Sequence, residues 1–399
     1  MSSRALTAGG TWVEVLVAFL RLGLISFGGP IAHLGFFRDE FVARRRWPEE
    51  PAYADLVALC QFLPGPTSSE VGMAIGLSRA GLAGALAAWV GFTLPSAVAL
   101  VLFAFGVDSL GNTLGTGWLH GLKVAAVAVV AQAVLGMMRT LAPDRERATL
   151  AVVAAAIVLL VPTAWGQIGT IALGAIVGAV LLRAPEAIGH AALPVGVGRS
   201  VGVAALVAFA VLLAGLPILS ALVPNHALAM VDVFYRAGSL VFGGGHVVLP
   251  LLQAAVVPHG WVTNDAFLAG YGAAQAVPGP LFTFAAYLGA VMKPAPNGWV
   301  GAGIALVAIF LPSFLLVMGA LPFWEALRRR PLARSALRGV NAAVVGLLLA
   351  ALYNPVWTAG ITGPADFALA AAAFLLLFLW QTPPWLVVAL CAVGGAALG

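Results

Sequence analysis

Two short segments carry the residues best suited to bind a ligand: QFLPGP at 61–66 and QAVPGP at 275–280. The first is followed by TSSE at 67–70, which adds three hydroxyl groups and a carboxylate, and the second by LFT at 281–283, which adds one hydroxyl. Proline and glycine break a helix, and proline suits the first turn of the next one. Because a helix N-terminus presents unpaired N–H groups and about half a positive charge, these segments suit an anion rich in acceptor oxygens.

Two glycine segments, SFGGP at 26–30 and VFGGGH at 241–246, have the same character. Each follows an arginine, Arg21 or Arg236, whose guanidinium offers a fork of donors to a tetrahedral oxyanion. His246 adjoins its glycines and is placed to donate to such an anion, whereas His33 is expected at the cytoplasmic boundary. The predicted substrate-binding residues are Arg21, Ser26, Gly28, Gly29, Gln61, Pro64, Gly65, Pro66, Thr67, Ser68, Ser69, Arg236, Gly243, Gly244, Gly245, His246, Gln275, Pro278, Gly279, Pro280 and Thr283.

Each of these residues also has a purely structural interpretation. TSSE reads as a capping box between Thr67 and Glu70, although Glu70 is also a candidate for proton coupling. Asp232 and Arg236 have the spacing of an ordinary helix-surface ion pair, and Arg21 lies two turns from Glu14. The two glutamines, Gln61 and Gln275, equally suit a role in tying the backbone of a turn together.

The composition places these segments in a membrane protein. The chain has 399 residues, of which 62% are hydrophobic and 9% charged, whereas a soluble domain carries roughly 25% charged residues. Apolar runs of near-spanning length recur at 82–106, 118–138, 201–223 and 299–321, so the chain is expected to be an all-α polytopic membrane protein. The two cysteines cannot form a metal cluster. No cofactor and no nucleic-acid partner are expected, and membrane lipid is expected to surround the protein.

The chain is a tandem duplication. Landmarks recur in one order, and the second copy is offset by about the same number of residues throughout: Phe19/Phe234, Arg21/Arg236, Gly23/Gly238, Phe27/Phe242, Trp47/Trp261, Gly65/Gly279, LPS at 94–96 and 311–313, and LHGLKVAAV and LRGVNAAVV at 119 and 337. Five or more matches in order predict two repeats. The expected division is an N-terminal repeat at 1–190, a linking transmembrane segment at 191–224 and a C-terminal repeat at 225–399.

Charge indicates that the repeats are inverted. The loop before the first PGP holds four arginines at 38–46, but the matching loop at 251–261 holds no Arg or Lys. The loop after the first LPS, at 107–118, also has none, whereas 325–339 has five arginines. Since cytoplasmic loops collect Arg and Lys, matching loops are expected on opposite sides of the membrane, with Arg44 to Arg46 cytoplasmic and the loop near His259 periplasmic.

The apolar pieces on either side of each PGP are too short to span a bilayer alone. They predict re-entrant hairpins with PGP at the tip. FGG suits the tip of a second hairpin in each half, and helices that span fully but kink at Gly and Pro are the alternative, equally open for the FGG segments. Irregular backbone at membrane depth persists only when it is buried in protein or lines a wet cavity. Broken helices at the interface of inverted repeats are a recurring transporter construction.

These motifs resemble the chromate ion transporter family in its long two-domain form. The resemblance rests on the FGGP and FGGG segments, the two QxxPGP segments and the two LPS segments, and covers nearly the whole chain. It implies bacterial inner-membrane efflux of chromate, which confers resistance, with sulfate as a chemically similar oxyanion. It places the family's motif regions on Arg21, on residues 27–30 and on residues 61–66, and on the matching positions of the second repeat. Gly245 stands where the first copy has Pro30, so the two tips need not be equivalent.

Three other functions stay open at this stage. A carrier for sulfate or another divalent oxyanion fits the same motifs. An anion channel is the second, because selectivity and gating cannot be read from these residues. The third is an intramembrane enzyme; against it, the chain has no G-x-S-x-G or H-E-x-x-H motif and no paired intramembrane carboxylates.

Overall fold

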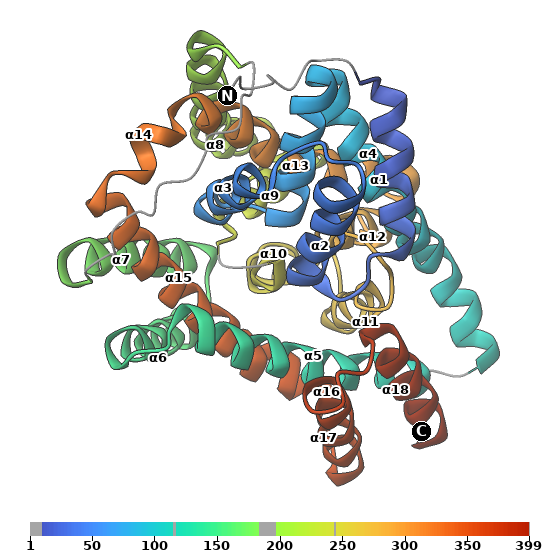
Figure 1. Cartoon of the computed structure of the whole chain (residues 1–399). Coiled ribbons are helices and arrows are strands. Elements are labelled where there is room, and N and C mark those ends of the chain that lie inside the picture. Colours follow the sequence, from blue (N-terminus) through green and yellow to red (C-terminus); the bar gives the residue numbers. More distant parts are fainter. Residues whose placement is uncertain (1–9, 115–116, 183–196, 243–244, 399) are drawn as a thin grey trace.

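The computed structural model describes residues 10–114, 117–182, 197–242 and 245–398, and within them it is helical without strands (Figure 1). Five helices are long and apolar enough to cross a membrane, in agreement with an all-α polytopic membrane protein. The elements are α1 (Trp12–Ile25), α2 (Gly29–Phe37), η1 (Arg38–Arg44), α3 (Glu50–Phe62), α4 (Thr67–Leu114), α5 (Gly117–Leu141), α6 (Arg145–Leu160), α7 (Ala164–Leu181), α8 (Arg199–Leu222), α9 (His226–Leu240), η2 (Gly245–Val247), α10 (Val248–Val256), α11 (Asn264–Ala274), η3 (Leu281–Thr283), α12 (Phe284–Val291), α13 (Gly298–Ala320), η4 (Leu321–Phe323), α14 (Trp324–Arg328), α15 (Pro331–Ala351), η5 (Leu352–Trp357), α16 (Thr358–Gly360), α17 (Pro364–Phe378) and α18 (Pro384–Leu398).

The first FGG segment is the tip of a hairpin, not a kink in a spanning helix. Helix α1 ends at Ile25, and α2 starts at Gly29 after Gly28 takes a left-handed conformation with φ of 100°. The chain then runs back along α1, because Phe41 stacks on Phe19 at 4.7 Å and Arg45 reaches Glu14 at 3.5 Å. Segment 12–45 therefore enters and leaves on the same side.

The first PGP segment forms a second hairpin that ends at the same place. The guanidinium of Arg79 lies 5.1 Å from the ring of Trp47 and 3.1 Å from the carboxylate of Glu14. The chain breaks at Ala80 and Gly81, both non-helical within α4, so α4 consists of two separate parts. Gly76 and Gly84 then pack against each other's backbone carbonyl, as antiparallel helices with small residues do.

The second repeat closes its hairpins in the same manner. The ring of His226, at the start of α9, lies 4.5 Å from that of Trp261, which follows α10. The backbone N–H of Lys293, after α12, donates to the carbonyl of Trp261 at 3.0 Å. Trp261 and Lys293 are the repeat partners of Trp47 and Arg79, so matching residues close both pairs of hairpins.

Helices α5 to α7 and α15 to α18 form a second group, called the frame here, that lies beside the hairpin core, to its left and below it in Figure 1. Each repeat contributes to both the core and the frame. Helix α5 packs on α17 and α18, and α15 on α6 and α7, so these four frame contacts join opposite repeats (Figure 1). Gly121 of α5 lies against the backbone of Cys391 and Gly395, and its repeat partner Gly339 lies against Gly174 and Gly178. Small residues allow this close approach of membrane helices.

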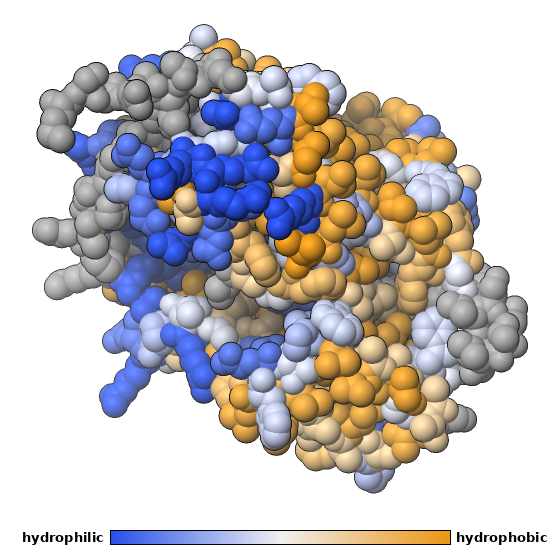
Figure 2. Space-filling view, turned by 45° about the vertical axis from the view of Figure 1, so that its right-hand side comes forward, coloured by the Kyte–Doolittle hydropathy of each residue, from blue (hydrophilic) through white to orange (hydrophobic). Residues whose placement is uncertain are grey.

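The outer surface matches a lipid environment. Large apolar side chains are exposed along α1, α4 and α8, including Val17, Leu86 and Val207. On the face in Figure 2, apolar residues cover the right side and much of the base, while hydrophilic residues gather at the upper left. Since lipid does not drive apolar side chains inward as water does, this exposure is expected of a multi-pass membrane protein.

Candidate functional site

The N-termini of the four broken helices meet at one place in the hairpin core. A Cβ built on Gly245, at the start of η2, would lie 3.6 Å from Leu281 at the start of η3 and 3.9 Å from Pro30 at the start of α2. His33 of α2 and Ser68 in the first turn of α4 lie 3.2 Å apart. The two FGG tips and the two PGP tips therefore converge, as their sequences predict.

Each PGP tip is hydrogen-bonded to the FGG tip of the other repeat. The N–H of Gly65 donates to the carbonyl of Val241 at 2.7 Å, and the N–H of Gly279 donates to the carbonyl of Ser26 at 2.9 Å. Gly65 and Gly279 are repeat partners, and so are Val241 and Ser26. The junction of the tips therefore lies on the pseudo-two-fold axis of the molecule.

Both tip glycines also lie against a serine from the LPS segment of the other repeat. Gly65 has φ of 146° and Gly279 has φ of 100°, a backbone region that favours glycine. A Cβ on Gly279 would lie 2.9 Å from Ser96 Oγ, and one on Gly65 would collide with Ser313 Oγ and Glu70 Oε1. Ser96 and Ser313 were noted in the sequence only as repeat landmarks; their duplicated hydroxyl was the signal that marked them as site residues.

Several buried polar groups around the junction have no hydrogen-bond partner among the described residues. They are Ser26 Oγ, Ser69 Oγ, Thr93 Oγ1, Ser313 Oγ and both carboxylate oxygens of Glu70. Buried polar groups are nearly always hydrogen-bonded, so a cluster of unpartnered ones needs an explanation such as a ligand or water. Hydroxyl groups beside helix N-termini have the chemistry to donate to an oxyanion.

His33 belongs to this cluster, and its predicted place at the cytoplasmic boundary is wrong. It is 1% exposed, because the chain turns at the FGG tip and α2 runs back into the core. Its Nε2 lies 3.1 Å from the carbonyl of Ser26, which only accepts, so Nε2 carries the proton. Its Nδ1 then accepts from the hydroxyl of Ser68, and the ring ties three segments together.

Glu70 is fully buried and does not close the capping box that TSSE suggests. Its backbone N–H donates to the carbonyl of Pro66 at 3.1 Å. Its carboxylate lies instead against Gly65 and the hydroxyl of Ser313, with no other partner in the described part of the chain. The capping-box interpretation is therefore wrong, because the side chain points into the junction and not back to Thr67.

The structure does not bring the two predicted arginines to the tips. Arg21 is exposed on the outer face of α1, beside the exposed Leu20 and Leu24. Arg236 binds Asp232 of the same helix at 2.5 Å, as the structural interpretation of their spacing predicts. It also lines a cavity of about 400 Å³ between α7 of the frame and α9 and α10 of the core, together with Thr163, Gln167 and His259.

The other predicted residues divide between the junction and the surface. Gln61 is exposed, so it does not tie its hairpin together, and Gln275 is half-buried with an unpartnered Nε2. His246 is held at 2.7 Å by the hydroxyl of Tyr271, and Thr283 donates to the carbonyl of Pro280 at 2.8 Å. Gly28, Gly29, Pro64, Pro66, Thr67 and Pro278 lie in the tips or their first turns, whereas Gly243 and Gly244 fall outside the described residues.

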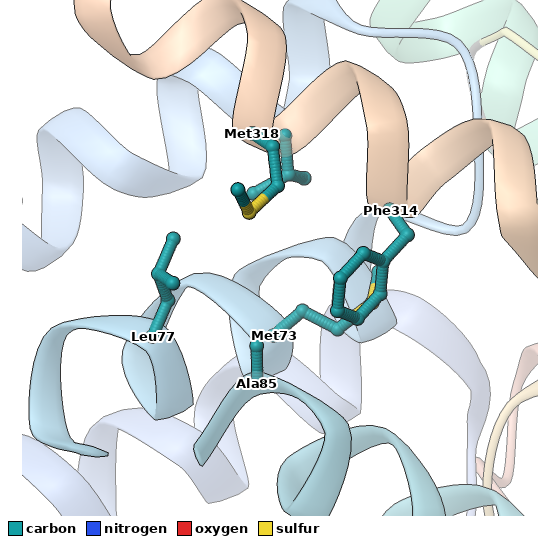
Figure 3. Close-up of a pocket in the computed structure, with 6 residues that line it drawn as sticks. Met73, Leu77, Ala85, Phe314 and Met318 are labelled. Atoms are coloured by element: carbon teal, nitrogen blue, oxygen red, sulfur yellow. The ribbon is translucent and has the colours of Figure 1, made fainter. Parts of the chain in front are cut away.

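An apolar recess adjoins the junction along the seam between α4 and α13. Met73, Leu77 and Ala85 of α4 face Phe314 and Met318 of α13 across it (Figure 3). The recess begins one turn beyond Glu70 on α4 and directly after Ser313 on α13. Its side chains offer no hydrogen bonds, so they keep this flank of the junction free of polar contacts.

The described part of the chain contains no group of three or more His, Cys, Asp or Glu side chains placed to hold a metal ion. Two inverted repeats whose broken helices meet on a pseudo-two-fold axis define a class of multi-pass membrane protein that includes many secondary transporters. The site at their junction offers backbone and hydroxyl donors, which suits an anion.

Comparison with known proteins identifies the family. The sequence profile described as chromate transporter matches residues 13–181 and again 228–396. The chain belongs to the chromate transporter family, in its long form with two copies of the domain, and α8 lies between the matched ranges.

Named relatives extend over nearly the full length. The chain is 29% identical to a chromate transport protein of Pseudomonas aeruginosa, over 96% of this chain and 91% of that protein. It is 25% identical to a chromate transport protein of Cupriavidus metallidurans, over 96% and 92%. An uncharacterized transporter of Methanocaldococcus jannaschii is 23% identical over 85% and 83%. No solved structure matches the chain.

Proposed function

We propose that this protein is a secondary carrier that exports chromate across the bacterial inner membrane and so confers chromate resistance. The observation that carries the proposal is the convergence of four half-helix N-termini, cross-linked by the Gly65–Val241 and Gly279–Ser26 hydrogen bonds, on one axis. The names of the relatives support chromate as the substrate. The membership in a transporter family favours transport over catalysis.

The electrostatics of the junction suit a dianion. Four helix N-termini at about +0.5 each offset roughly two negative charges, before nearby C-termini reduce the sum. The hydroxyl groups of Ser26 and Ser69 are buried and free to donate, and that of Ser313 is buried beside Glu70. A tetrahedral oxyanion has acceptor oxygens on every side, so donors that converge from both repeats match it better than they match a planar carboxylate.

The close packing of the tips supports a carrier over an open pore. Gly65 lies directly against Ser313 and Glu70, and Gly279 lies against Ser96. Tips that lock one repeat to the other must part before an ion passes, which is the behaviour expected of alternating access between inverted repeats.

Sulfate, or another divalent oxyanion, is the second candidate substrate. Sulfate shares the charge and tetrahedral shape of chromate, and donors at the junction respond to those two properties alone. Chromate and sulfate are therefore compared in the same vesicle uptake assay.

Uptake of chromate into inside-out membrane vesicles that contain the protein tests this proposal. We expect saturable accumulation that depends on an imposed membrane potential or pH gradient and is competed by sulfate if sulfate is also carried. Vesicles without the protein are the control. Absence of protein-dependent uptake of both ions would refute the proposal, and linear, non-saturable uptake would favour a channel.

A further inference from the structure

Glu70 is the one charged group that the structure places inside the junction of the tips. It is fully buried, and its carboxylate lies against Gly65 of its own hairpin and Ser313 of the other repeat. Apart from the adjacent hydroxyl of Ser313, neither of its oxygens has a hydrogen-bond partner in the described chain. Its repeat partner is Phe284, so the molecule places this carboxylate in one repeat only.

A buried carboxylate with no cationic partner is costly, and the surroundings explain why it is tolerated here. Glu70 lies in the first turn of α4, where the partial positive charge of the helix N-terminus favours an anion. Three further N-termini converge beside it. Burial by itself opposes ionisation of a carboxyl group, and the converging N-termini act against that effect in the empty site.

We propose that Glu70 takes the place of the oxyanion in the empty carrier, so that binding of the oxyanion requires Glu70 to take up a proton. This inference rests on the proposed function, because it assigns the coupling ion of the same site. Two anions in contact within one buried site repel each other strongly. Protonation of Glu70 removes one of them, frees the surrounding dipoles and lets the oxyanion use them.

The cycle balances in charge and in protons. In the empty state Glu70 is ionised and faces the helix N-termini. When a dianion binds, Glu70 takes one proton from the same aqueous side, and the loaded carrier bears one proton and one dianion. On release at the other side the proton leaves with the anion. Each turnover therefore moves one net negative charge, which an inside-negative membrane potential drives outward.

Other titratable groups near the first turn of α4 are few. On α2, His33 contacts Ser68, and α3 carries Cys60, which is buried nearby, and Asp55, which is buried and has an interaction of its own. On α12, Tyr287 donates its hydroxyl to the carbonyl of Ala266. On α1, Glu14 pairs with Arg79 at the far end of the half-helix. Helix α13, which brings Ser313, carries no titratable side chain, and α9 contributes the carbonyl of Val241. Glu70 is thus the acid that a bound dianion would affect most.

Proton uptake on anion binding tests the proposal without transport. Purified protein in a weakly buffered solution with a pH indicator receives sulfate, which stays fully ionised near neutral pH, whereas chromate itself takes up a proton there. We expect about one proton to be taken up for each sulfate bound, and the apparent Kd to rise about tenfold for each unit of pH increase.

Three variants make the result specific. Glu70→Gln is expected to bind sulfate with no proton uptake and with a Kd that no longer depends on pH. Glu70→Asp should keep proton uptake, and Glu146→Gln, which changes an exposed carboxylate on α6, should behave as the unmodified protein.

The possible results separate this inference from the proposed function. Sulfate binding to the unmodified protein without proton uptake, or proton uptake that persists in Glu70→Gln, would overturn the role of Glu70. Failure of every form to bind sulfate, chromate or molybdate would instead refute the oxyanion site itself.

Discussion

At the residue scale, the junction depends on two glycines at positions where any larger amino acid would be strained and would clash with its neighbours. Gly65 and Gly279 both adopt positive φ and both lie against a serine from the opposite repeat. The sequence predicts these positions well, because glycine between two prolines marks a turn by local chemistry alone. It does not predict which serine or histidine a tip will meet, and for that reason Ser313 and His33 were missed.

A methyl group at either tip glycine should abolish transport. Gly65→Ala forces a left-handed conformation on alanine and drives its Cβ into Ser313 and Glu70, and Gly279→Ala drives its Cβ to within 2.9 Å of Ser96 Oγ. We expect vesicle uptake of chromate to fall at least tenfold for each. Gly303→Ala on α13, where a Cβ meets nothing within 4 Å, is the control and should transport normally. Normal uptake by both tip variants would contradict the account.

At the element scale, short half-helices return to the side from which they entered. The apolar lengths around PGP predict this for α3 and α4, whereas for the FGG segments the sequence leaves a kinked span equally open. The contact between Glu14 and Arg45 decides for a hairpin. The repeat alone does not predict how each half-helix is rotated about its axis. For that reason Arg21 was expected at the tips but lies exposed on the outer face of α1.

The two arginines are therefore expected to differ. Arg21→Gln changes an exposed side chain and should leave transport within about twofold of normal. Arg236→Gln leaves Asp232 buried without its partner, which costs about 3–5 kcal/mol, so the amount of folded protein in the membrane should fall. The double variant Asp232→Asn with Arg236→Gln should restore that amount, measured by detergent extraction and gel filtration.

The restored double variant also reports on the cavity beside α7. If its folded amount is normal and its chromate uptake is normal, Arg236 serves only to neutralise Asp232. If the protein is folded but inactive, Arg236 acts on the anion as it passes the cavity. Loss of transport in Arg21→Gln with normal folding would contradict the exposed position of Arg21.

The loop that closes the first hairpin should respond to acid. Partial burial opposes ionisation of Glu40, but hydrogen bonds from Arg44 and Arg45 outweigh it and hold the pKa of Glu40 below its ordinary value. A lowered pKa means that ionised Glu40 stabilises the fold at neutral pH and loses this effect as the pH falls through its folded-state pKa.

Replacement of Glu40 tests whether its ionised form stabilises the fold. Glu40→Gln should lower the thermal unfolding midpoint at neutral pH, and the difference from the unmodified protein should begin to shrink once the pH falls below about 4 and disappear only below the folded-state pKa of Glu40. Glu50→Gln, which removes an exposed pair with Arg38, should have a smaller effect because solvent screens it. A difference that grows toward low pH would contradict the assignment.

At the scale of the whole molecule, each inverted repeat supplies packing and hydrogen-bond partners for the other. Each frame helix packs on helices of the other repeat, and each PGP tip bonds the other repeat's FGG tip. The order of landmarks and the charge bias predict the inversion. They do not predict the exchange of partners, since a repeat in sequence specifies matching elements and not which of them touch.

Accessibility of two loops tests the inversion. The variants Arg46→Cys and Gly260→Cys, which keep the buried Cys60 and Cys391, are labelled in intact cells with a membrane-impermeant thiol reagent, and the unmodified chain is the control. We expect labelling at Gly260 and none at Arg46 until the cells are opened. Labelling of both positions from the same side would contradict the predicted orientation.

The central claim is that a tetrahedral oxyanion binds where the four half-helix N-termini meet. The most direct test is the structure of the protein with molybdate or selenate bound, whose heavy atom is located by anomalous scattering. The account predicts one strong peak on the pseudo-two-fold axis, within hydrogen-bond reach of Ser313 and the tips at Gly65 and Gly279. A peak confined to the cavity beside Arg236, with none at the tips, would contradict it.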